Sequence, residues 1–146
     1  MKVLVTGAAG AIGRVLRDGI AGRYDLVRLT DRVEMAPARQ GVEVVQAELT
    51  DMDAVCAAME GMDAVVHLSA IAFENEWDAI LPNNIAATYN VIEAARRCGA
   101  RRIVFASSNH AISFYRRSQL IDHTVPHRPD TRYGLTKAFG EDLGSL

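Results

Sequence analysis

Apolar and polar residues alternate along the chain in blocks that predict strands and helices in turn. Short apolar runs predict about five strands, and these runs lie at residues 3–5, 26–29, 42–47, 64–68 and 102–106. Segments with helical spacing of apolar residues predict helices, at residues 14–20, 51–61, 83–97 and 131–143. Strands that alternate with helices are typical of a parallel sheet with helices on both faces. The pattern therefore predicts a Rossmann-like, doubly wound α/β fold.

Residues that start and stop helices occur where the pattern changes. Asp51 is a typical N-cap for the second predicted helix, and Gly61 and Gly99 follow the second and third helices as stop signals. Pro126 and Pro129 break any helix in the segment 107–130, which we expect to be irregular.

A glycine-rich turn directly follows the first predicted strand. Gly7 permits a tight turn, Gly10 would let a pyrophosphate approach the backbone, and Gly13 would let the next helix pack closely on the strand. The start of that helix would offer unpaired N–H groups to the phosphates. Because a strand precedes the turn and a helix follows it, the sequence predicts a dinucleotide site rather than a plain glycine-rich turn.

An acidic residue, Asp31, ends the second predicted strand. A carboxylate at this position can accept hydrogen bonds from the adenosine ribose, which favours NAD and would repel a 2′-phosphate. The neighbouring Arg32 leaves NADP open, since a guanidinium group could tolerate that phosphate.

A second group of polar residues lies near the end of the chain. Tyr133 and Lys137 are four residues apart and hence on one face of the predicted helix. A nearby ammonium group favours a phenolate, so Tyr133 is a candidate general base toward a substrate hydroxyl. Residues 107–110 follow the fifth strand, at the carboxyl edge where such sheets bind ligands. Ser107 taken alone is more typical of a capped turn than of a catalytic residue.

The remaining histidines and cysteines predict no metal site. His67 lies within a buried strand and is expected to satisfy a local hydrogen bond. His123 and His127 lack metal-ligand spacing and are expected in loops. Cys56 and Cys98 are isolated and are expected to be free thiols in a reducing cytosol.

Length and charge limit the classes of partner. The 146 residues predict one domain. A net charge of −2 and a pI near 6.1 give no electrostatic case for nucleic acid or an anionic membrane. No apolar run reaches the ~20 residues that span a bilayer, and the N-terminus predicts a strand rather than a signal peptide. We therefore expect a cytoplasmic protein that binds a small molecule.

Several motifs, in order along the chain, resemble those of the extended short-chain dehydrogenase/reductase superfamily, the NAD-dependent epimerases and dehydratases. They lie at residues 6–13, 67–70, 83–84, 107–108 and 133–137. Residues 105–110, 128–130 and 139–141 are more specifically similar to bacterial uronate dehydrogenases, which oxidise a hexuronic acid to an aldarolactone with NAD. The resemblance implies that residues 1–146 form an NAD-binding Rossmann domain that acts on a sugar acid.

The resemblance also implies roles for single residues. Ser108 would orient the substrate oxygen, Tyr133 would remove the hydroxyl proton, and Lys137 would favour the phenolate and hold the nicotinamide ribose. The implied cofactor contacts are Gly7, Gly10, Ala11, Ile12, Gly13, Asp31, Arg32, Glu48, Leu49, Leu68, Ser69, Ala70, Asn84, Tyr133 and Lys137. The implied contacts to the sugar acid are Ala72, Ser108, Asn109, His110 and Tyr133.

Some positions depart from the family pattern. Ala72 stands where uronate dehydrogenases commonly have a serine, and Glu48 replaces an aspartate. Family members continue for roughly another hundred residues, which include a substrate-covering segment, so we expect the chain to be truncated at its C-terminus. A non-catalytic or incomplete dinucleotide-binding module, or a sugar-nucleotide epimerase or dehydratase, is the alternative. A homodimer through helices 83–97 and 131–143 is also expected.

Overall fold

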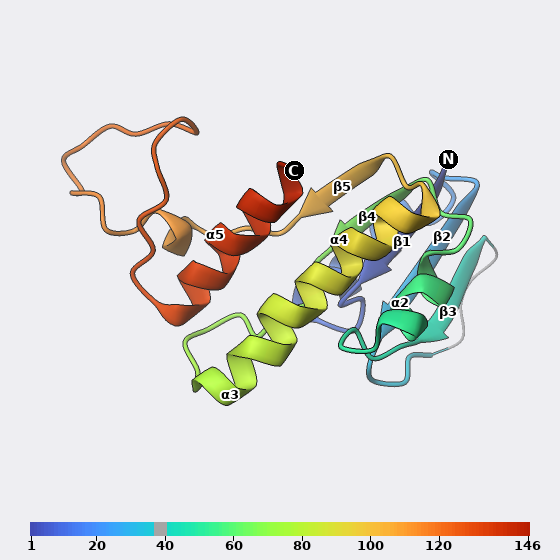
Figure 1. The fold of residues 1–146 in the computed structure, drawn as a ribbon. Helices are drawn as coiled ribbons and strands as arrows, with labels where there is room; N and C mark the ends of the chain where they lie inside the picture. The colour runs from blue at the N-terminus through green and yellow to red at the C-terminus, as the bar shows by residue number, and fades with distance from the viewer. Residues whose placement is uncertain (37–40) are drawn as a thin grey trace.

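The chain folds into one parallel sheet with helices packed against it (Figure 1). The structure, a computed structural model, describes residues 1–36 and 41–146. The strands are β1 (Lys2–Thr6), β2 (Leu26–Asp31), β3 (Val42–Gln46), β4 (Ala64–His67) and β5 (Arg102–Phe105). They pair in the order β3-β2-β1-β4-β5, and every pair is parallel. The predicted α/β class is confirmed. The loop expected between β2 and β3 includes Pro37, which lies outside the described residues.

Helices connect the strands and follow the last one. They are α1 (Ala11–Ile20), α2 (Met52–Met59), α3 (Trp77–Ile80), the π-helical turn η1 (Leu81–Ala86), α4 (Ala87–Cys98), the 3-10 turn η2 (Asn109–Ala111) and α5 (Arg132–Gly144). Asp51 caps α2 as predicted, because its carboxylate accepts the N–H groups of Asp53 and Ala54. Gly99 ends α4 in the left-handed conformation, with φ of 74°.

The helix predicted at residues 83–97 begins earlier than the sequence indicated. In the structure α3 starts at Trp77 and leads through η1 into α4 without a break. Pro82 lies in the π-helical turn, where a wider turn replaces the regular ladder that an internal proline would disrupt. The prediction of this boundary was wrong because apolar spacing does not reveal a π-turn. Similarly, α1 begins at Ala11 rather than residue 14.

The sheet separates two apolar clusters. Leu4 and Val65 point to one face, where they pack among residues of α2 and α4 such as Val91. Val5 and Val27 point to the other face, where partly buried residues of α1 cover them. Successive strand residues alternate between faces, so β1 contributes to both clusters. Figure 1 shows α2, α4 and α5 on the same side of the sheet. Helices therefore cover both faces, as predicted.

The parallel topology brings the carboxyl ends of all five strands to one edge. The glycine turn follows β1, Asp31 ends β2, Leu68 follows β4 and Ser107 closely follows β5. Polar segments that are far apart in sequence therefore meet at this edge. Among the described helices, none is long and apolar enough to cross a membrane.

Candidate active site

The glycine turn after β1 is packed against its neighbours. Gly7 has φ of 68°, and a Cβ there would lie 2.7 Å from the backbone nitrogen of Ser69. A Cβ on Gly13 would lie 2.5 Å from the carbonyl oxygen of Gly7. The expected tight turn at Gly7 and the close helix packing at Gly13 are both confirmed. Among the described residues, only the Gly7 oxygen comes near a Cβ placed on Gly10, at 3.2 Å, so the expected approach of a pyrophosphate stays a prediction.

The carboxylate of Asp31 is tied to the glycine turn. Its Oδ2 accepts the N–H of Ala9 at 3.0 Å, and its Oδ1 accepts the N–H of Val33 at 3.3 Å. These bonds fix the carboxylate at the end of β2. Arg32 reaches across this edge, and its guanidinium donates to Oδ1 of Asn83 at 3.4 Å.

A cleft of about 290 Å³ lies at this edge of the sheet. It is lined by Gly7, Ala9, Gly10, Asp31, Arg32, Val33, Glu48, Leu49, Leu68, Ser69, Ala70, Ile71, Asn83 and Ala87. Nine of the residues expected to contact the cofactor are therefore together in one cleft. The others, which the cleft wall does not include, are Ala11, Ile12, Gly13, Asn84, Tyr133 and Lys137.

Ala11 and Ile12 form the exposed first turn of α1. The N–H groups at such a helix start have no partner within the helix, so they offer backbone donors rather than side chains.

Asn84 is buried and is not among the residues that line the cleft. Only 2% of the residue is exposed. Its Oδ1 accepts the N–H of Ile71 at 2.8 Å, and its Nδ2 donates to the carbonyl of Ile71 at 3.0 Å and to Oγ1 of Thr136 at 3.2 Å. The amide is thus occupied by protein groups. It forms a structural link between the loop after β4 and α5, and the cofactor contact expected of Asn84 stays a prediction.

Helix α5 presents Tyr133 and Lys137 on one face, as predicted. Thr131 caps the helix, since its Oγ1 accepts the N–H of Gly134 at 2.9 Å. The ammonium of Lys137 lies 5.7 Å from the centre of the Tyr133 ring and 4.7 Å from that of Phe105. Aromatic faces attract cations at such distances.

Lys137 is a buried cation. Only 4% of the residue is exposed, and burial lowers the pKa of its ammonium group to about 8. Within the described ranges no Asp or Glu oxygen lies within 4.0 Å of Nζ. A desolvated lysine at the ligand-binding edge of a sheet is typical of a functional site.

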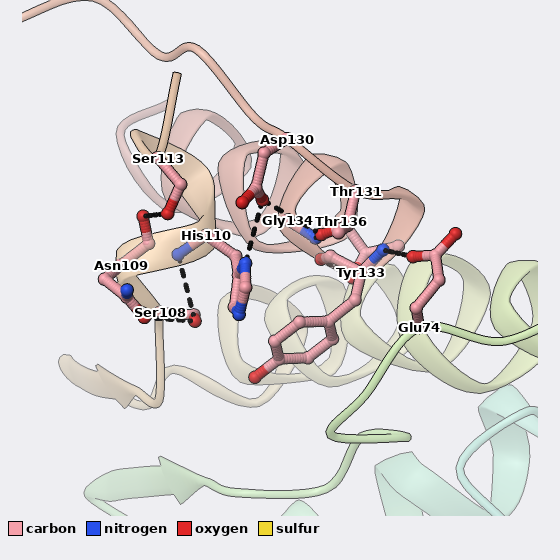
Figure 2. Close-up of polar contacts among 10 residues, drawn as sticks. All are labelled: Glu74, Ser108, Asn109, His110, Ser113, Asp130, Thr131, Tyr133, Gly134 and Thr136. Atoms are coloured by element: carbon pink, nitrogen blue, oxygen red, sulfur yellow. Dashed lines mark hydrogen bonds and ion pairs between the residues drawn. The ribbon is translucent and has the colours of Figure 1, made fainter. Parts of the chain in front are cut away.

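The segment after β5 lies beside Tyr133 (Figure 2). Ser108 caps η2, and its Oγ accepts the N–H of His110 at 3.2 Å. Nδ1 of His110 lies 2.8 Å from Oδ1 of Asp130. The rings of His110 and Tyr133 meet edge to face, with centres 5.9 Å apart. Asn109 is exposed on the same turn. The structure thus brings together the expected substrate residues Ser108, Asn109, His110 and Tyr133. Ala72 is exposed in the loop after β4.

Ser107 turns away from this group. Its hydroxyl donates to Glu141 of α5, whose other oxygen lies 2.8 Å from Nε2 of His127. Partial burial acts to raise the pKa of Glu141, but the bonds with Ser107 and His127 outweigh it and lower the pKa. The hydrogen bond to Glu141 raises the pKa of His127. Ser107 therefore joins the end of β5 to α5. Its role is structural, but the hydroxyl does not cap the local turn as the sequence predicted.

His67 has the structural role that was expected. Its Nδ1 lies 2.6 Å from Oγ1 of Thr6, and its Nε2 lies 3.1 Å from Oγ1 of Thr88. Both ring nitrogens are satisfied inside the protein. Among the described residues, no three His, Cys, Asp or Glu side chains gather as a metal site.

The sequence did not indicate a role for Glu74. Its Oε2 accepts the backbone N–H of Tyr133 at 3.1 Å (Figure 2), and its Oε1 lies 3.5 Å from the guanidinium of Arg132. The carboxylate therefore joins the loop after β4 to the first turn of α5. No local pattern marks this contact, because the partners are 59 positions apart.

Known proteins share both the sequence and the fold of this chain. It is 46% identical over 99% of its length to the uronate dehydrogenase of Pseudomonas syringae pv. tomato. The structure of the glucuronic acid dehydrogenase from Chromohalobacter salexigens has a TM-score of 0.95, 46% identity, and coverage of 99% of this chain and 55% of that chain. A mutant uronate dehydrogenase from Agrobacterium tumefaciens complexed with NAD has a TM-score of 0.93 and 46% identity, with 97% of this chain and 54% of that chain covered.

The chain spans about half the length of the curated relatives it matches, with 53% of the Pseudomonas syringae protein covered. Residues 3–144 match the NAD dependent epimerase/dehydratase family. This match includes the glycine turn, Asp31, Ser108 and the pair of Tyr133 and Lys137. The chain belongs to the NAD dependent epimerase/dehydratase family.

Proposed function

We propose that the protein is an NAD-dependent oxidoreductase that oxidises a hexuronic acid, such as glucuronate or galacturonate, to an aldarolactone. The observation that carries this proposal is the buried Lys137 beside the ring of Tyr133, at the sheet edge that also holds the glycine cleft. The similarity to uronate dehydrogenases supports the substrate class.

The residues present fit NAD. The glycine turn and the first N–H groups of α1, at Ala11 and Ile12, would hold the pyrophosphate. Asp31 would accept the hydroxyls of the adenosine ribose, since its carboxylate is fixed at the cleft wall. Glu48 and Leu49 would flank the adenine, and residues 68–70 would line the floor. When bound, NAD supplies the acceptor for a hydride.

In this proposal Tyr133 is the general base. The ammonium of Lys137 lies 5.7 Å from the centre of the Tyr133 ring. A phenolate oxygen can take the proton of the substrate hydroxyl as the hydride leaves the same carbon. Ser108 donates a hydrogen bond to the substrate oxygen. Asn109 and His110, on the same turn, hold the rest of the sugar acid near Ala72.

Replacing the phenol tests the role of Tyr133. In Tyr133→Phe we expect turnover of glucuronate or galacturonate to fall by about 10²–10⁴-fold, as for loss of a general base, while NAD affinity is retained. NADH absorbance reports turnover. The control is Tyr115→Phe, because the Tyr115 hydroxyl donates to the carbonyl of Pro126 in the loop. A Tyr133→Phe variant with wild-type kcat would contradict the proposal.

Assays of the wild-type protein with NAD and uronic acids also separate the proposed dehydrogenase from a non-catalytic dinucleotide-binding module. NAD binding without turnover of any uronic acid would favour an incomplete dinucleotide-binding module. Titration of NADP against NAD decides whether Arg32 tolerates a 2′-phosphate beside Asp31.

We further propose that the protein is cytoplasmic and forms a homodimer in which α4 and α5 pair with those of a second copy. The two helices contact each other within the chain, and Tyr89 on α4 and Leu135 on α5 are about half exposed. Sedimentation that shows only monomer at micromolar concentration would contradict the dimer.

A further inference from the structure

His110 is held by contacts of its backbone and of its ring. Its carbonyl oxygen accepts the N–H of Asp130 at 3.4 Å and packs against Gly134, where a Cβ would overlap it. The edge of the ring meets the ring of Tyr133, and Nδ1 bonds Asp130. Among residues 1–36 and 41–146, no hydrogen-bond partner faces Nε2. Since 42% of the side chain is exposed, a ligand can reach this nitrogen.

Asp130 determines which ring nitrogen carries the proton. The hydrogen bond from His110 lowers the pKa of Asp130, so its side chain is a carboxylate at neutral pH. A carboxylate only accepts hydrogen bonds, and therefore Nδ1 of His110 must hold the hydrogen between them. The neutral ring then presents a lone pair at Nε2. Thr131 Oγ1 also donates to Oδ1 of Asp130 at 3.2 Å, which further fixes the carboxylate.

We propose that Asp130 is a positioning residue that holds His110 in the Nδ1–H tautomer, so that Nε2 accepts a hydrogen bond from a hydroxyl group of the sugar acid beside Tyr133. This inference rests on the proposed function. It adds a specificity determinant, because the lone pair at Nε2 in this tautomer recognises a donor on the substrate and disfavours an analogue that offers only an acceptor there.

Imidazole nitrogen NMR of the full chain measures the tautomer without reference to activity. We expect His110 to be Nδ1–H in the wild type and to shift toward Nε2–H in Asp130→Asn. The His110 signal is assigned by its loss in His110→Gln. The control is Asp122→Asn, since Asp122 lies in the same irregular segment and bonds only Thr124 among the described residues. An Nε2–H tautomer in the wild type would overturn the proposal.

Kinetics then tests the effect on substrate. In Asp130→Asn we expect KM for the uronic acid to rise about tenfold, with kcat and NAD affinity little changed, since one hydrogen bond made equally in ground and transition states is lost. Asp130→Asn should add nothing further in a His110→Gln background, because Asp130 acts through His110. An unchanged KM, a further loss in that background, or a joint loss of NAD binding would overturn the inference. If the wild type oxidises no uronic acid, the proposed function fails instead.

Discussion

At the scale of single residues, the candidate site depends on close backbone contacts that only glycine permits. Gly7 and Gly13 bring the turn after β1 against the loop after β4 and against α1, and Gly134 brings α5 against the carbonyl oxygen of His110. The last contact sets the distance between the ring of Tyr133 and the turn that carries Ser108. The position of the Tyr133 phenol therefore depends on the absence of a Cβ at the neighbouring Gly134.

Adding a methyl group at Gly134 tests this dependence. Gly134→Ala would force α5 away from His110, and we expect the free energy of unfolding to fall by about 1–3 kcal/mol, as in other overpacked sites. Turnover should fall as well, because Tyr133 moves with the helix. Urea unfolding and NADH absorbance measure the two effects. Gly144→Ala is the matched control, since a Cβ at Gly144 meets no atom of residues 1–36 or 41–146 within 4 Å. If Gly134→Ala and Gly144→Ala have the same free energy of unfolding, the close contact between Gly134 and His110 does not limit the position of α5.

Single residues were predictable where their role is local. The tight turn at Gly7, the internal hydrogen bonds of His67 and the shared face of Tyr133 and Lys137 follow from spacing along the chain. The contacts of Asn84 and Asp130 were not predictable, because they depend on segments brought together by the fold. The amide of Asn84 bonds Ile71 and Thr136, and its expected cofactor contact stays a prediction.

At the scale of elements, the start of α5 is stabilised by two side chains from different parts of the chain. Thr131 accepts the N–H of Gly134 and was predictable as a polar residue at the start of a helix. Glu74 accepts the N–H of Tyr133 and brings a negative charge to the positive end of the helix. The loop after β4 is thereby attached to the helix that carries the proposed base.

Truncation of Glu74 tests this attachment. Glu74→Ala leaves the N–H of Tyr133 without its partner, and we expect a loss of about 1 kcal/mol in the free energy of unfolding. Faster amide exchange is expected in the loop after β4. Glu76→Ala is the control, because 87% of the Glu76 side chain is exposed and its nearest contact to Arg132 is 3.8 Å. If Glu74→Ala and Glu76→Ala have the same free energy of unfolding and the same rates of amide exchange, the contact of Glu74 does not stabilise the start of α5.

At the scale of the whole molecule, the parallel sheet explains why one edge collects the chemistry. The alternation of strand and helix patterns predicted this sheet, because crossover connections impose one direction on all strands. The same pattern did not predict that α3, η1 and α4 form one continuous helical unit. Continuity through Pro82 depends on a π-turn, and a π-turn is not recognisable from apolar spacing.

The centre of the molecule contains a histidine whose protonation affects overall stability. His67 lies between β1 and α4, and burial, with the charge of Lys137 as a second cause, lowers its pKa from 6.5 to about 3. The folded state therefore binds this proton less readily than the unfolded state does. The stability that depends on neutral His67 is fully present above pH 6.5 and is lost as the pH falls from 6.5 toward 3. Each pH unit in this window should cost at most about 1.4 kcal/mol from this group.

Urea unfolding from about pH 7 to about pH 4 measures this loss, with His67→Asn as the test variant. We expect His67→Asn to be less stable than the wild type near pH 7, because Thr6 and Thr88 lose a well-placed partner. Its stability should fall less steeply toward acid, since the buried titrating group is gone. Other groups contribute to acid unfolding in both proteins, so the difference between the two slopes isolates His67. The control is His123→Gln in the exposed loop, which should keep the wild-type slope. Equal slopes for His67→Asn and the wild type would mean that His67 does not control acid stability.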